Sequence, residues 1–172
     1  MGATYDDLKE HLDNENMWVS FFSRIYDGQM PPLRISDWRN AVVGKTADLN
    51  EINLRKGIML RRIKKNQKAE TEDIIPIPPS LIHFIKASHI KGELFPEMSV
   101  TDINTMIKKI YGDKKANPHY WRSYYTVHKL TQMKTKEEIM EAVRIMDHSL
   151  KTNATYYNKQ ASSAYNDLIA GK

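Results

Sequence analysis

Signals for the start of an α-helix recur along the whole chain. Each signal is a Ser, Thr or Asn that is followed either by an acidic residue three positions later or directly by proline. The signals lie at Thr4/Asp7, Ser99/Asp102, Asn117/Pro118 and Thr135/Glu138. Such side chains accept hydrogen bonds from N–H groups of the first turn, and proline suits the first helical position. We therefore expect a chain built from many short helices.

Apolar residues recur at helical spacing between these signals, and no run alternates over several strands as a sheet would require. The predicted fold is all-α, a compact bundle of about eight short-to-medium helices. The expected helices cover 4–12, 16–27, 36–43, 48–68, 80–91, 99–111, a segment from 118, 135–150 and 155–170.

The segment 69–79 interrupts the helical pattern. It ends in Ile74-Ile75-Pro76-Ile77-Pro78-Pro79, in which the prolines favour extended backbone. We expect two small subdomains joined here: residues 1–68, an acidic arm plus helices ending in a basic amphipathic helix, and residues 80–172, a helical subdomain. The connection itself, 69–79, is predicted to be extended and to pack against the protein through its isoleucines.

The most informative charge feature is a basic run from Arg55 to Lys68, which carries seven basic side chains and no acidic one over fourteen residues. If 48–68 is a helix, one face carries the apolar side chains and the opposite face carries the cations. Cations aligned in this way attract phosphates, because each contact displaces condensed counterions. An ordinary solvated helix, a membrane surface or a protein partner are the alternatives.

A second basic region follows, with Lys108, Lys114, Lys115 and Arg122. Aromatic residues at 120, 121, 124 and 125 accompany it, as in proteins that stack nucleic-acid bases on rings. Their helical spacing favours a core position instead, with Tyr125 and Arg122 expected to be the most exposed. Helices 99–111 and 118 onward also suggest a helix-turn-helix, but the connection at 112–117 is longer than that motif requires.

Catalytic and metal-binding signatures are weak. The chain has no cysteine, which excludes disulfides, thiolate metal sites and cysteine nucleophiles. Val43-Gly44-Lys45-Thr46 resembles the end of a phosphate-binding loop but lacks its first glycine, and none of the six histidines is four residues from another. We predict no enzymatic activity, no metal and no cofactor.

The sequence predicts a non-enzymatic nucleic-acid-binding accessory protein that contacts DNA or RNA through phosphates. The residues expected to bind are Arg55, Arg61, Arg62, Lys64, Lys65, Lys68, Lys114, Lys115 and Arg122. The alternative is a structural or adaptor subunit of a larger assembly, such as a virus or phage particle, that acts through protein contacts or self-association. No apolar run is long enough to span a bilayer, so we expect no membrane partner and an intracellular location.

Overall fold

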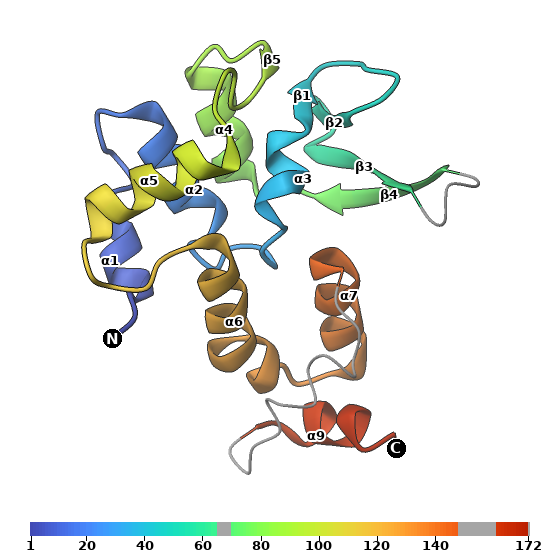
Figure 1. Ribbon diagram of the computed structural model, residues 1–172. Helices are drawn as coiled ribbons and strands as arrows, with labels where there is room; N and C mark the ends of the chain where they lie inside the picture. The colour runs from blue at the N-terminus through green and yellow to red at the C-terminus, as the bar shows by residue number, and fades with distance from the viewer. Residues whose placement is uncertain (65–69, 148–160, 172) are drawn as a thin grey trace.

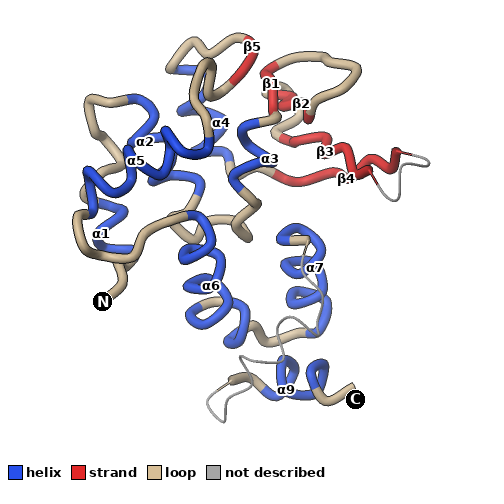
Figure 2. The backbone as a smooth tube through the Cα atoms, viewed as in Figure 1, coloured by secondary structure: helices blue, strands red, loops and turns tan. Residues whose placement is uncertain are grey.

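The computed structural model describes residues 1–64, 70–147 and 161–171. Three helices come first, four strands follow in succession, a fourth helix separates these from the last strand, and the rest of the described chain is helical (Figure 2). The elements, in order, are α1 (Tyr5–Lys9), α2 (Met17–Ile25), α3 (Ile35–Arg39), β1 (Ala41–Val43), β2 (Asn50–Asn53), β3 (Ile58–Lys64), β4 (Glu70–Pro76), α4 (Pro79–Ala87), β5 (Gly92–Glu93), α5 (Val100–Tyr111), α6 (Pro118–His128), the 3₁₀ turn η1 (Leu130–Gln132), α7 (Lys136–Met146) and α9 (Ser163–Ile169).

A five-stranded mixed sheet overturns the predicted all-α fold. Its strand order is β4-β3-β2-β1-β5. Strands β1 and β2 are parallel, while the β1–β5, β2–β3 and β3–β4 pairs are antiparallel. The predicted helix 36–43 is also wrong in its second half, because α3 ends at Arg39 and residues 41–43 form β1.

The predicted basic helix 48–68 is wrong because its residues form β2, a turn and β3. In the turn, Lys56 N donates to Asn53 Oδ1 at 2.9 Å, and Gly57 N donates to Asn53 O at 2.9 Å. Gly57 has a φ of +68°, a left-handed conformation that ends the turn and that glycine adopts without steric cost. Along β3, Met59 and Arg61 are both buried at a spacing of two, which is the period of a strand.

Segment 70–76 of the predicted connection is the edge strand β4. Its register with β3 runs from Ile58 opposite Pro76 to Lys64 opposite Glu70. In Figure 1 this hairpin extends away from the helices. Residues on both sides of the connection contribute to one hydrophobic core, including Trp38 and Phe95.

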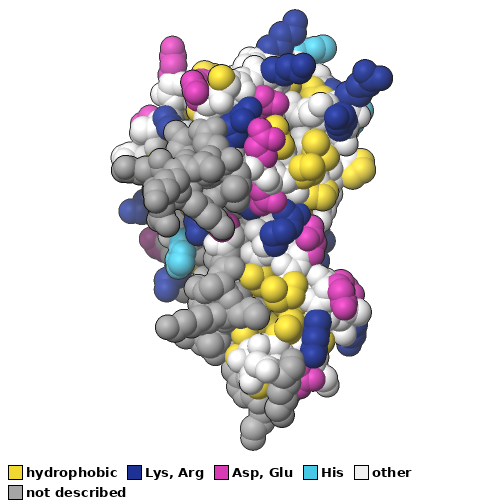
Figure 3. Space-filling model, turned by 90° about the vertical axis from the view of Figure 1, so that its right-hand side faces the viewer, with side chains coloured by type: hydrophobic (Ala, Val, Ile, Leu, Met, Phe, Trp, Pro, Cys, Tyr) yellow, Lys and Arg dark blue, Asp and Glu magenta, His cyan; other side chains and the backbone are white. Residues whose placement is uncertain are grey.

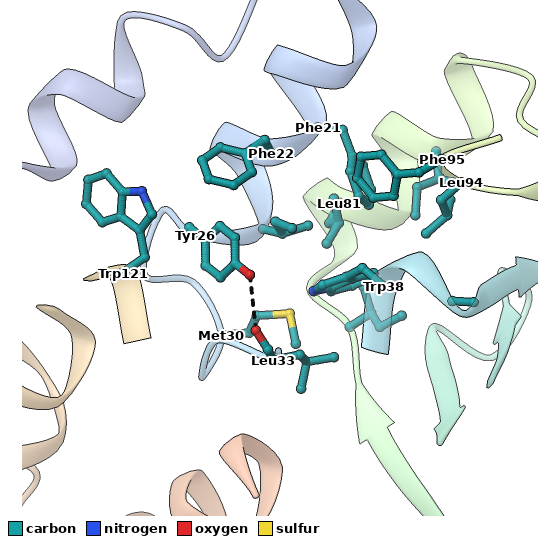
Figure 4. Packing of buried hydrophobic residues seen from close by; sticks show 14 of the residues in the cluster. Phe21, Phe22, Tyr26, Met30, Leu33, Trp38, Leu81, Leu94, Phe95 and Trp121 are labelled. Carbon is teal, nitrogen blue, oxygen red and sulfur yellow. Dashed lines mark hydrogen bonds between the residues drawn. The ribbon is translucent and has the colours of Figure 1, made fainter. Parts of the chain in front are cut away.

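The main core lies where α2, α3 and α4 meet the sheet. Helices α1, α2, α4 and α5 gather on one side of α3, and the sheet lies on its other side (Figure 1). Phe21 lies between Trp38 and Phe95, with ring centroids 5.6 and 5.2 Å away (Figure 4). Tyr26 is buried there too, and its hydroxyl donates to Leu33 O at 3.2 Å (Figure 4).

A second, smaller core joins the last helices. Ile139, Val143 and Met146 of α7 pack with Tyr125 of α6 and Tyr165 of α9. The caps that the sequence indicates are confirmed for α5, α6 and α7: Ser99, Asn117 and Thr135 each accept a backbone N–H of the first turn. Helix α7 ends earlier than predicted, at Met146, and residues 148–160 lie outside the described part of the chain.

Candidate functional site

Arg61 is buried and takes part in a structural network. Only 3% of the residue is exposed, and its guanidinium donates to Asp73 Oδ2 at 2.7 Å and to Ile145 O at 2.7 Å. Asp37 Oδ2 lies 3.6 Å away. Arg144 of α7 also pairs with Asp73, so the two arginines share this carboxylate. The alternating face of β3 therefore turns Arg61 inward, where it joins the sheet to α7.

Arg62 also has carboxylate partners. It pairs with Glu51 and Glu72 at 3.0 Å each, across the neighbouring strands β2 and β4. Thr46 O accepts a further hydrogen bond from it at 2.8 Å. Acidic side chains also lie beside Lys and Arg on the face drawn in Figure 3. The charge of Arg62 is thus compensated by acidic residues that flank the basic run in the sequence.

The other predicted residues of the basic run separate into two groups. Arg55 is exposed in the β2–β3 turn. Lys64 is the last residue of β3, and its side chain is not described; Lys65 and Lys68 lie outside the described residues.

Arg122, on α6, is in a different electrostatic situation from Arg61. The sequence predicts that Arg122 and Tyr125 are exposed, and this prediction is wrong. Arg122 is 6% exposed, and Tyr125 is buried as well. Its guanidinium donates to two neutral carbonyl oxygens, Pro32 O at 2.9 Å and Met146 O at 2.7 Å. Within the described residues, no carboxylate lies within ion-pair distance of it. Burial, and then the nearby positive charge of Arg34, lower the pKa of Arg122 to about 10.

Arg34 lies next to Arg122, although the two are far apart in the sequence. Its side chain is 47% exposed, and it donates to Asp147 Oδ2 at 2.6 Å and to Asp147 O at 3.1 Å. Arg122 binds Met146 O, so consecutive carbonyls at the end of α7 hold the two guanidiniums. We call Arg34 and Arg122 the arginine pair.

A basic pocket of about 720 Å³ opens at the amino-terminal end of α6. We call it the α5–α6 pocket; its basic lining residues are Lys108, Lys114, Lys115 and His119, all exposed. Asp113 is the acidic residue among those that line it, and Ile35, the neighbour of Arg34, forms part of its wall. His119 precedes Arg122 by three residues on α6, hence both lie on one side of that helix. Neither arginine lines the pocket itself, but each adjoins a residue that does: Arg34 precedes Ile35, and Arg122 lies about one helical turn after His119.

The amino-terminal segment fixes the loop that carries the pocket lysines. Ala3 N donates to Lys115 O at 2.9 Å, and Lys115 N donates to Met1 O at 3.1 Å. Asp7 pairs with Lys114 at 3.1 Å, and its backbone hydrogen bond with Thr4, followed by its hydrogen bond with Lys114, lowers the pKa of Asp7. The acidic arm thus neutralises one pocket lysine and leaves Lys108 and Lys115 without a carboxylate partner among the described residues.

Sequence reasoning named Lys114, Lys115 and Arg122 but missed Arg34 and His119. The spacing of His119 and Arg122 on one helical face was a usable signal. Arg34 offered none, because only the fold brings it beside Arg122.

Other chemistries find little support in the described part of the chain. No group of three or more His, Asp or Glu side chains is close enough there to hold a metal ion. Gly44 and Lys45 lie in the loop after β1, which a parallel strand follows rather than a helix. Among the helices described, none is long and apolar enough to cross a membrane.

Comparisons of the chain with protein-family models, with curated proteins and with solved structures gave no match. The chemistry of the arginine pair and of the α5–α6 pocket is therefore the basis of the functional proposal.

Proposed function

We propose that this protein binds the phosphodiester backbone of a nucleic acid at the arginine pair and the adjoining α5–α6 pocket. The observation that carries the proposal is the environment of Arg122, a buried guanidinium whose hydrogen-bond acceptors are neutral carbonyls. Buried charges are normally paired, because an unpaired ion loses its hydration without compensation.

Arg61 provides an internal comparison. It is buried to a similar extent, but Asp73 binds it directly. After burial, the charge of Arg34 lowers the pKa of Arg122 further, whereas Tyr26 and the carboxylates of Asp37 and Asp147, which lie beyond ion-pair distance, act in the opposite direction. A bound anion would compensate the charge of Arg122, because Asp147 already pairs with Arg34. The planar donor pattern of arginine matches the oxygens of a phosphate.

The pocket supplies the remaining features of a backbone-binding surface. Lys108 and Lys115 are exposed point charges, and the first turn of α6 adds the positive end of a helix dipole. Nucleic-acid phosphates follow one another at regular spacing, so several separate cations suit them better than they suit a single small anion.

A second candidate function is hydrolysis of the bound nucleic acid, in which water attacks a phosphodiester phosphorus and the P–O bond to the departing sugar oxygen breaks. It is favoured by the position of His119, which lies about one helical turn before Arg122 and lines the α5–α6 pocket. Guanidiniums stabilise negative charge that develops on phosphoryl oxygens, and an imidazole can carry a proton to or from a reacting oxygen.

Binding is tested by fluorescence anisotropy with labelled duplex and single-stranded DNA and RNA over a range of salt concentrations. Arg34 and Lys114 are already paired with carboxylates. The three remaining contacts, from Arg122, Lys108 and Lys115, predict a log–log salt slope of about −2.7 for duplex DNA and about −2.1 for single strands. The Lys108→Glu/Lys115→Glu variant is expected to lose about a hundredfold or more in affinity.

The matched control is Lys45→Glu/Lys91→Glu, which makes the same change in net charge at exposed lysines outside the pocket. Equal affinities of the two variants would reject the pocket as the binding site.

Hydrolysis is tested with end-labelled DNA and supercoiled plasmid, analysed on denaturing gels. Cleaved strands are expected, and His119→Gln should reduce them about a hundredfold while binding persists. If wild-type protein binds but yields no cleaved strands, the second candidate is rejected and the first stands.

A further inference from the structure

A second concave surface lies beside the start of β3, between the β2–β3 turn and α4. It has a volume of about 410 Å³. Its basic lining residues are Arg55 and Lys56 of the turn and His83 and Lys86 of α4. We call it the turn groove. It shares no lining residue with the α5–α6 pocket.

Both walls of the turn groove are held in place by the fold. On α4, Ile82, His83 and Lys86 follow Pro79 at intervals of three, four and seven residues, so they lie on one helical face. On the opposite wall, Ile77 N donates to Gly57 O at 2.9 Å, which ties the turn to the chain entering α4. A groove with fixed walls loses little conformational entropy when it is filled.

The charge of the turn groove is uncompensated. Arg55, Lys56, His83 and Lys86 are all exposed, and none has an ion-pair partner among the described residues. No acidic residue of the described chain lines the groove. Arg62 on the same strand hairpin has two carboxylate partners, so the missing partners at the turn are a local property.

The floor of the groove is apolar. Leu54 is half-buried, and Ile82 is 8% exposed. An apolar centre with a charged rim is the usual arrangement of a protein interaction surface. It suits single-stranded nucleic acid less well, because bases bind by stacking on aromatic rings and no aromatic residue of the described chain lines this groove.

We propose that the turn groove binds an acidic peptide segment of a partner protein. An apolar side chain of that segment would contact Leu54 and Ile82, and flanking Asp or Glu carboxylates would pair with Arg55, Lys56 and Lys86. Charge complementarity of this kind selects partners and speeds association. This inference goes beyond the proposed function and does not depend on it.

The test uses full-length ¹⁵N-labelled protein and a short N-acetylated peptide of alternating acidic and leucine residues. We expect saturable shifts in the amide signals of Lys56, Gly57 and Lys86. The Arg55→Glu/Lys86→Glu variant should bind the peptide at least about tenfold more weakly, whereas Lys45→Glu/Lys91→Glu should bind like wild type. Circular dichroism and urea unfolding verify that each variant folds.

Three results would overturn the inference. They are the absence of saturable shifts at the groove, equal weakening in both charge-reversed variants, and equal binding of a control peptide with Asn and Gln in place of the acids. A fourth would reassign the groove to phosphate: inorganic phosphate or duplex DNA that gives the same shifts and displaces the peptide.

Discussion

Asp73→Asn is expected to destabilise the protein strongly, because Asp73 is the closest carboxylate to the buried Arg61. The Arg61 side chain is 4% exposed, that of Asp73 is 16% exposed, and the two groups are 2.7 Å apart. Removing one partner of a buried ion pair typically costs about 3–5 kcal/mol, since the other charge stays buried without compensation.

The position of Asp37 sets the expected value within that range. Its Oδ2 atom lies 3.6 Å from Arg61, so part of the compensation survives in the variant. We therefore expect the free energy of unfolding to fall by about 3 kcal/mol, near the lower limit. With a denaturant slope of about 2 kcal/mol per molar urea, the unfolding midpoint should fall by about 1.5 M.

Urea unfolding followed by circular dichroism measures this change, and Glu72→Gln is the matched control. It removes one carboxylate from the same strand, but the Glu72 side chain is 54% exposed and pairs with Arg62 at 3.0 Å. An exposed pair of this kind contributes less than about 1 kcal/mol. If Asp73→Asn and Glu72→Gln cost the same, the Arg61 network does not stabilise the fold as described.

Two further predictions concern Asp37 and the β2–β3 turn. Burial raises the pKa of Asp37, more than Arg61 lowers it, so the folded protein keeps this proton to a higher pH than the unfolded chain does. The contribution of Asp37 to stability should therefore decline as the pH rises from the ordinary aspartate value of about 3.9 through the raised pKa. The free energy of unfolding of Asp37→Asn should consequently rise relative to that of wild type as the pH goes from acidic to neutral, as measured by urea titrations. A difference between the two proteins that stays constant with pH would contradict the raised pKa of Asp37. Gly57→Ala should cost about 1–2 kcal/mol for conformational reasons, because Gly57 has a φ of +68° and an added Cβ meets nothing closer than 4.0 Å. Gly57→Asn should cost less in the same assay, and the reverse order would point to a steric cause.

The helices with complete start signals were predictable from the sequence. Ser99, Asn117 and Thr135 cap α5, α6 and α7 as expected, because a cap depends on residues that are close in the chain. The positions of these helices in the fold were not predictable in the same way, since packing partners come from distant segments.

The sheet was missed because the basic run satisfies a helical pattern by chance. Met59 and Ile52 fit one face of a helix, but in the structure they lie opposite each other on paired strands. Three local signals opposed the helix: the β-branched Ile58, Gly57 in the middle of the run, and Asn53 as a turn residue. Long-range pairing with β4 decided the outcome, and a single helical window contains no information about it.

The charge argument failed in part for the same reason. Glu51, Glu72 and Asp73 flank the basic run in sequence, and strand pairing brings them against Arg61 and Arg62. A helix would have kept most of these acids away from the cations. Composition therefore indicated the correct number of charges but not which of them remain uncompensated.

The last turn of α7 has a consequence for how the proposed site responds to its ligand. Arg61 of β3 and Arg122 of α6 donate to its carbonyls, and Arg34, which precedes α3, donates to the carbonyl of Asp147 directly after it. A phosphate that binds Arg34 and Arg122 competes with these carbonyls for the same guanidinium N–H groups. The affinity for phosphate and the stability of the packing of α7 are therefore thermodynamically linked. Linkage is reciprocal: a substitution that loosens the end of α7 without touching the arginines should tighten phosphate binding, and bound phosphate should make that helix end easier to displace.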